Sequence, residues 1–110
     1  MNTTPANRPK RLAKSATAVP SHSLSGFKSG KLVITNAVAE AADRLAMSKA
    51  DIRGALAGLR PAHFYKSEPS VAVPGQMMDV YHLPHDGRTI YVKFHCDSND
   101  VYVLTSFKEK

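Results

Sequence analysis

The residues of this 110-residue chain best suited to chemistry are lysines, tyrosines and one arginine in its second half. They are Tyr65, Lys66, Tyr81, Arg88, Tyr91, Lys93, Tyr102, Lys108 and Lys110. Cationic groups stabilise charge on a phosphate, and a phenol exchanges protons when neighbouring cations lower its pKa. The set suits metal-free RNA cleavage, in which a ribose 2′-hydroxyl attacks the adjacent phosphate. Lysines on a strand face are more often solvated charges, so composition alone leaves the function open.

Other chemistries find little support in the sequence. There is no Gly-rich phosphate loop and no nucleophile elbow. Five histidines are scattered along the chain; His82 and His85 flank a turn but lack partners at metal-ligand spacing. We therefore expect no metal and no cofactor. A single cysteine, Cys96, forms no internal disulfide and favours a reducing compartment, so we expect the cytoplasm. No apolar run is long enough to span a membrane.

The basic charge is confined to the first 31 residues. The net charge is +6, and residues 1–31 contain six Lys and Arg with no acid, whereas later basic and acidic residues balance. Residues 1–23 are rich in Pro, Ser, Thr and Ala, so we expect a disordered basic arm, followed by one folded domain over 24–110. Such an arm attracts polyanions without choosing a sequence. A solvated tail and an organellar transit peptide fit the same composition.

Two helices are expected before the chemically interesting residues. Leu24 and Phe27 anchor a short ordered segment near residues 23–30. Thr35 or Asn36 begins a helix to about Met47, with an apolar stripe at helical spacing. Ser48 and Asp51 form a capping box for a second helix that buries Ile52, Leu56 and Leu59. These stripes are typical of core, so we expect the helices to support the strands of the second half.

Three strands are expected at the end of the chain, over 77–83, 88–96 and 101–107. The segment 63–76 precedes them and contains Pro69, Pro74 and Gly75, so we expect Lys66 to open a long loop. Asp86-Gly87 is a hairpin signal. Strict alternation along the strands puts Tyr91 and Lys93 on one face with Tyr102 and Lys108, and the aliphatic residues on the other. Fold class is α+β, with two helices packed on a small antiparallel sheet.

Several short segments resemble the MqsR family of toxins from bacterial type II toxin–antitoxin modules. They are Phe64-Tyr65-Lys66-Ser67, Asp79-Val80-Tyr81, Tyr91-Val92-Lys93 and the terminal Ser106-Phe107-Lys108-Glu109-Lys110. Their order and approximate spacing are kept over residues 63–110. The resemblance implies a RelE-like fold and a metal-independent mRNA interferase that prefers GC-containing triplets such as GCU. It also implies a cognate antitoxin partner, zinc-bearing and DNA-binding through a helix-turn-helix.

The resemblance also implies roles for individual residues. Lys66, Tyr91 and Lys108 match the catalytic positions of the family. A functional glutamine of the family falls on Met78, and the tryptophan before it falls on Met77, while Gln76 lies two residues upstream of Met78. Tyr81, Arg88 and Lys93 are our candidates for binding RNA. Two other functions stay open: a non-catalytic RNA-binding module of the same fold, and a basic RNA- or ribosome-associated protein that binds through its arm.

Overall fold

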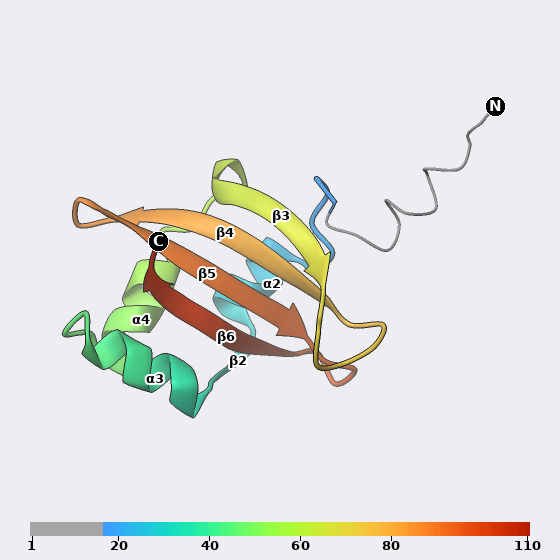
Figure 1. The fold of residues 1–110 in the computed structure, drawn as a ribbon, viewed down its shortest axis with the longest axis horizontal. Coiled ribbons are helices and arrows are strands. Elements are labelled where there is room, and N and C mark those ends of the chain that lie inside the picture. The colour runs from blue at the N-terminus through green and yellow to red at the C-terminus, as the bar shows by residue number, and fades with distance from the viewer. Residues whose placement is uncertain (1–16) are drawn as a thin grey trace.

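A computed structural model describes residues 17–110 and shows an α+β fold, as predicted (Figure 1). The helices are α2 (Leu24–Ser29), α3 (Asn36–Asp43) and α4 (Lys49–Leu56), followed by a short 3₁₀ turn, η1 (Pro61–His63). The strands are β2 (Lys31–Ile34), β3 (Phe64–Pro69), β4 (Met77–His85), β5 (Arg88–Cys96) and β6 (Val101–Glu109). The predicted disorder of residues 1–16 lies outside the described part of the chain.

The five strands form one sheet in the order β2-β6-β5-β4-β3. Strands β3 to β6 pair antiparallel, but β2 runs parallel to β6, so the sheet is mixed and the expectation of an antiparallel sheet is wrong at this edge. The β4–β5 hairpin turns at Asp86-Gly87, both with positive φ, as the Asp-Gly signal predicts.

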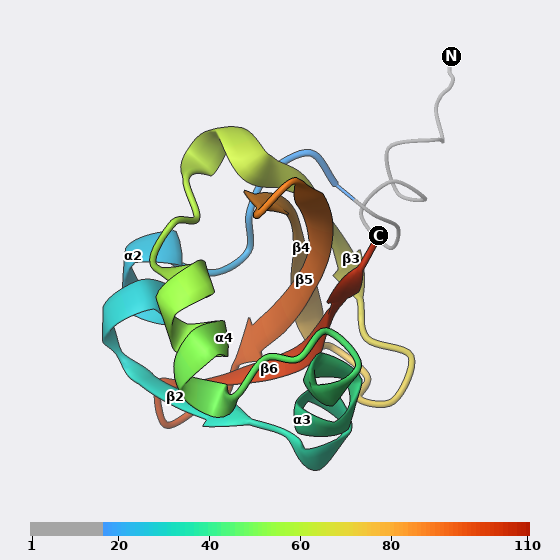
Figure 2. The same ribbon diagram turned by 90° about the vertical axis from the view of Figure 1, so that its left-hand side faces the viewer.

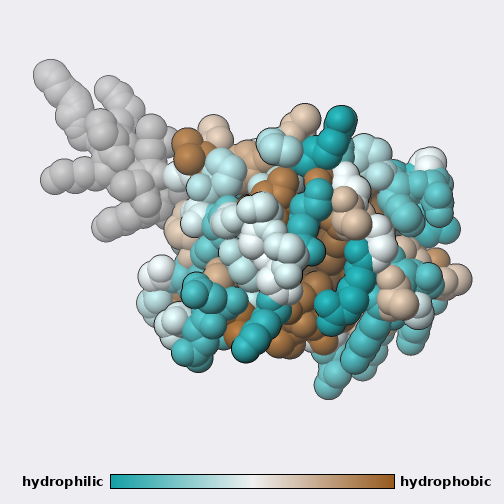
Figure 3. All heavy atoms as spheres, turned by 180° about the vertical axis from the view of Figure 1, so that it is seen from behind, coloured by the Kyte–Doolittle hydropathy of each residue, from teal (hydrophilic) through white to brown (hydrophobic). Residues whose placement is uncertain are grey.

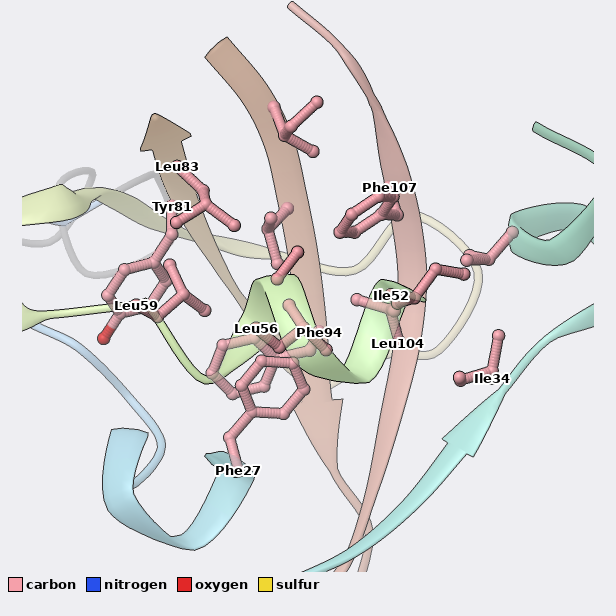
Figure 4. Packing of buried hydrophobic residues seen from close by; sticks show 14 of the residues in the cluster. Phe27, Ile34, Ile52, Leu56, Leu59, Tyr81, Leu83, Phe94, Leu104 and Phe107 are labelled. Atoms are coloured by element: carbon pink, nitrogen blue, oxygen red, sulfur yellow. The ribbon is translucent and has the colours of Figure 1, made fainter. Parts of the chain in front are cut away.

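Helices α2 and α4 cover one face of the sheet (Figure 2). The caps of the two predicted helices are confirmed: Thr35 accepts from the Val38 amide, and Ser48 and Asp51 form the capping box. On the covered face Phe27 of α2 stacks on Phe94 of β5, with ring centroids 3.7 Å apart (Figure 4). Seen from this side, hydrophobic surface shows mostly in gaps between hydrophilic side chains (Figure 3). This face holds the core.

The segment Phe64–Pro69 is an edge strand and not part of a loop, so the expected position of Lys66 in a loop is wrong. Proline disfavours central strands, but Pro69 is the last residue of an edge strand, where no ladder bond is lost. Only Ser70–Gln76 forms the connection to β4, closed by a hydrogen bond from the Ser70 amide to the Gln76 carbonyl. It lies on the side of the sheet opposite to α2 and α4 (Figure 2).

Residues 17–23, expected to belong to the disordered arm, are bonded to the sheet. Thr17 exchanges two backbone hydrogen bonds with Ser67 of β3. The carboxylate of Asp79, fully buried, accepts hydrogen bonds from the amides of Ser21 and His22 at 2.8 to 3.1 Å. The ordered part of the chain therefore begins before residue 24. Among the described residues, no helix is long and apolar enough to cross a membrane.

Candidate RNA-cleavage site

The sheet face turned away from α2 and α4, here called the open face, carries two rows of side chains that cross the strands. Register places Lys66, Val80, Lys93 and Ser106 side by side in the first row. The second row is His82, Tyr91 and Lys108. Neighbouring strands are about 4.8 Å apart, and rows separated by two residues are about 7 Å apart. The three predicted catalytic residues, Lys66, Tyr91 and Lys108, are therefore neighbours on one surface.

A bulge in β3 and a bulge in β6 bring these side chains to the open face. In β3, Phe64 pairs with Tyr81 and Lys66 with Val80, so Tyr65 is an extra residue. In β6, Leu104 pairs with Phe94 and Ser106 with Lys93, so Thr105 is extra, and its hydroxyl donates to the Lys93 carbonyl at 3.1 Å. An extra residue reverses the alternation of faces beyond it.

The reversal in β6 corrects the strict alternation expected from the sequence. Tyr102 and Leu104 lie on the covered face together with Phe107, whereas Lys108 lies on the open face. Tyr102 and Lys108 thus lie on opposite faces of the sheet, because the bulge at Thr105 lies between them.

Cations and phenols lie close together on the open face. The Lys108 ammonium is 5.7 Å from the centre of the Tyr91 ring, and the Lys66 ammonium is 5.5 Å from that of Tyr65. Glu68 forms ion pairs with Lys66 at 2.8 Å and with Lys93 at 3.7 Å. The carboxylate holds the two ammonium groups near one point, where a phosphate could replace it.

His82 lies in the middle of this cluster and was missed as a site residue at the sequence level. Its ring stacks on Tyr65, with centroids 4.2 Å apart, and its centroid is 6.1 Å from that of Tyr91. The bulge is what places Tyr65 against it, and no sequence signal reveals an edge-strand bulge. Cross-strand pairing of His82 with Tyr91 depends on the β4–β5 register, which only the Asp-Gly turn could have suggested.

The local environment shifts the pKa values of these groups in different directions. Burial raises the pKa of Tyr91, and the Glu68 carboxylate raises it further, against the opposing effect of Lys66. This contradicts the expectation that cations lower the pKa of the catalytic phenol. Burial lowers the pKa of His82, and Lys110 and Lys66 add to the effect. The hydrogen bond to Glu68 raises the pKa of Lys66. At neutral pH the site therefore combines the protonated phenol of Tyr91, the neutral imidazole of His82 and the charged ammonium group of Lys66.

Two of the predicted RNA-binding residues lie away from the open face. Tyr81 is 1% exposed and packs on Phe64 and Phe94 in the core, where burial, with a smaller contribution from Asp79, raises its pKa to about 12. A ring so enclosed has no surface on which a base can stack. Arg88 lines a hollow of about 510 Å³ between α4 and the β4–β5 hairpin, on the helix side. Lys93, by contrast, lies in the first row.

Met78, at the position of the family's glutamine, also belongs to the open face, where it pairs with Glu68. It is 7% exposed, and its thioether offers RNA no strong hydrogen bond. In the described part of the chain, no three His, Cys, Asp or Glu side chains are grouped so as to hold a metal ion.

The fold and site define a class: a small α+β protein with cations, phenols and an imidazole on the uncovered face of its sheet. A family model described as "Motility quorum-sensing regulator, toxin of MqsA" matches residues 13–109, and the chain belongs to this MqsR toxin family. The chain is accordingly a toxin of a toxin–antitoxin system, with an antitoxin as partner. A search of curated proteins finds no match.

Proposed function

We propose that the chain is a metal-independent endoribonuclease that cleaves messenger RNA in the cytoplasm and is inhibited by a cognate antitoxin. The observation that carries the proposal is the convergence of Lys66, Tyr91 and Lys108 on the open face, around His82. On this one face, Lys66 comes from β3 and Lys108 from β6, with β4 and β5 between them. The width between them, about three strand spacings, suits an extended polyanion lying across the sheet.

The proposed reaction requires three catalytic roles of the protein: a base, a source of positive charge and an acid. A base removes the proton of the ribose 2′-hydroxyl as its oxygen attacks the adjacent phosphorus. Cations stabilise the additional negative charge on the phosphate oxygens. An acid protonates the departing 5′-oxygen, so the products are a 2′,3′-cyclic phosphate and a 5′-hydroxyl. No water is consumed, and the single proton taken from the 2′-hydroxyl is balanced by the proton given to the leaving oxygen.

Each of these catalytic roles has a candidate residue on the open face. Lys66 and Lys108 supply the positive charge. Tyr91 is the acid, because its raised pKa keeps the phenol protonated. His82 is the base, because its lowered pKa keeps the imidazole neutral and able to accept a proton. Lys93 and Tyr65 border these groups and are suited to holding a phosphate and stacking a base.

The family resemblance supports the finer details of the proposal. The cleavage preference is for GC-containing triplets such as GCU, and the antitoxin carries zinc and a helix-turn-helix that binds DNA. Met78 in place of the family's glutamine favours one rival, a non-catalytic RNA-binding module with the same fold. The basic composition of residues 1–23, expected to form an arm, supports the other rival, a protein that binds RNA or ribosomes mainly through that arm.

Expression in bacteria tests the proposal. Wild-type protein should arrest growth and fragment messenger RNA, and the purified protein should cut RNA equally well with a chelator present. Lys66→Ala should do neither, while Lys49→Ala, on the exposed start of α4, serves as the matched control. RNA binding without cleavage by wild type would favour the non-catalytic module. Loss of all RNA binding on deletion of residues 1–16 would favour the arm.

A further inference from the structure

A pocket of about 340 Å³ opens on the same face of the sheet, next to the proposed cleavage site. The β3–β4 connection forms one wall, and the open-face residues of β4, β5 and β6 form the floor. Glu68 and Lys93 line it, and both also belong to the cation cluster. The pocket is therefore continuous with the place where the scissile phosphate is proposed to bind.

The distance along β5 suits a neighbouring nucleotide. Lys93 and His95 follow Tyr91 on the open face, at about 7 and 13 Å along the strand. A phosphate bound near Tyr91 and Lys66 places the next nucleotide over this part of the sheet. Lys93, between the two sites, can contact the linking backbone.

The walls of the pocket are apolar. Val71 and Val73 of the connection are 104% and 52% exposed, and Met78 lies below them on β4. The Ser70 hydroxyl oxygen accepts hydrogen bonds from the amides of Ala72 and Val73, which closes the turn at the start of this wall. The two exposed valines beside the hollow therefore offer apolar contact area to a flat, partly apolar group that enters it.

The floor of the pocket offers hydrogen bonds. Ser106 and His95 line it, and Nδ1 of His95 is buried with no hydrogen-bond partner within residues 17–110. A buried polar atom without a partner is unfavourable, and a ligand that bonds to it removes this penalty. Burial and the neighbouring His22 lower the pKa of His95, so the ring is neutral and offers one donor and one acceptor. A base bound in the pocket would reach Nδ1 once the ring turns about its Cβ–Cγ bond.

A ligand for this pocket has an apolar flat surface, a polar edge and a link to a phosphate, which together describe a nucleobase of RNA. We infer that the pocket binds the base of the nucleotide next to the scissile phosphate and thereby determines which sequences the protein cleaves. The inference rests on the proposed function and assigns to that site its selectivity.

Mapping of cleavage sites in a random-sequence RNA pool tests the inference. His95→Gln and Val73→Ser should each change the base preference at one position beside the cut, with total cleavage reduced less than about 10-fold. Val33→Ser is the matched control, because Val33 on β2 is similarly exposed, at 47%, and lies outside the pocket. An unchanged preference in both pocket variants would overturn the inference.

A binding measurement separates this inference from the proposed function. Titration with a 2′-O-methyl trinucleotide, which cannot be cleaved, should shift the NMR signals of the His95 ring and the Val73 methyl groups but not those of Val33. If the signals shift and wild type cuts no RNA, the proposed function is wrong and the pocket stands as a base-binding site alone. If wild type cuts RNA and no pocket signal shifts, the pocket is wrong and the proposed function stands.

Discussion

The two faces of the sheet are built from the same strands and have opposite compositions. Along β5 the covered face carries Ile90, Val92 and Phe94, all fully buried, whereas the open face carries Tyr91, Lys93 and His95. Packing fixes the strands from one side, so the other side is free to hold cations at defined positions. Stability and chemistry thus reside at alternating residues, and substitutions on the two faces should separate them.

The largest effect on stability should come from the covered face. Phe94→Ala removes a fully buried ring that stacks on Phe27, and should lower the free energy of unfolding by about 4 kcal/mol. Urea unfolding followed by circular dichroism measures the loss. A change under 1 kcal/mol would show that this face is not the core.

Substitution on the open face should give the reverse result. Lys66→Ala and Lys108→Ala should each slow RNA cleavage about 100- to 1,000-fold, because each removes a charge that stabilises the transition state. The free energy of unfolding should change by less than about 1 kcal/mol, since both lysines are at least partly solvated. Single-turnover cleavage and urea unfolding measure the two quantities. If the lysine variants lost several kcal/mol of unfolding free energy together with their cleavage activity, the separation of the two faces would be contradicted.

Two tyrosines on neighbouring strands allow a direct comparison of the faces. Tyr91→Phe should slow cleavage about 100-fold, since the proposed acid is removed. Tyr81→Phe should leave cleavage within about 2-fold, because Tyr81 lies in the core. It should also reduce the loss of stability between pH 10 and about 12. There the phenol ionises in the unfolded chain but stays protonated when folded, so wild-type stability falls as pH rises. If Tyr81→Phe slowed cleavage and Tyr91→Phe did not, the assignment of Tyr91 as the acid would be wrong.

The pH profile of cleavage should report on His82. Its pKa lies below the usual 6.5, so the rate should stay constant at neutral pH and fall only as acid protonates the imidazole. His82→Asn should be slower by about 100-fold and should lose this acid limb. His85→Asn is the control, because His85 contacts Asp86 at the hairpin end of the same strand. An acid limb that persists in His82→Asn would assign the base to another group, with Glu68 the next to test.

The smallest effect should come from the bulge in β6. Thr105→Val keeps the side-chain shape but removes the hydrogen bond to the Lys93 carbonyl, costing about 1 kcal/mol of stability. Cleavage should slow about 10-fold because Lys108 is less firmly placed. Val103→Thr, on the same strand before the bulge, should have little effect. A cleavage rate equal to wild type would show that the bulge holds its form without Thr105.

Sequence signals between residues close together in the chain correctly predicted those structural elements that depend on short-range interactions. The caps at Thr35 and Ser48, the Asp-Gly turn and the alternation in residues 88–96 each depend on residues close together in the chain. Strand β2 was not predicted, because four residues pairing parallel to β6 leave no local pattern. Strand β3 was mistaken for a loop because proline, here Pro69, disfavours central strands, a rule that does not apply at an edge.

The candidate site was predicted only in part, for the same reason. Family motifs selected Lys66, Tyr91 and Lys108, and the register brings all three together. Tyr81 was misplaced because β4 is apolar on both faces: Val80 is fully buried on the open face beside Lys66 and Lys93. Tyr102 was misplaced because strict alternation of faces takes no account of the bulge at Thr105. Face assignment in this protein requires knowledge of pairing between distant strands.

The extra residue in β6 also bears on how the gene can change. Leu104 and Phe107 both lie on the covered face although they are three residues apart, which only the bulge allows. Loss or gain of one codon between those for Leu104 and Ser106 would make this separation even, so a regular strand would keep Phe107 and Lys108 on their present sides. Loss or gain of two codons would leave the separation odd, and a bulge would have to form again to keep the core ring and the proposed catalytic cation in place. Length differences among descendants of this gene should therefore accumulate in odd numbers at this place.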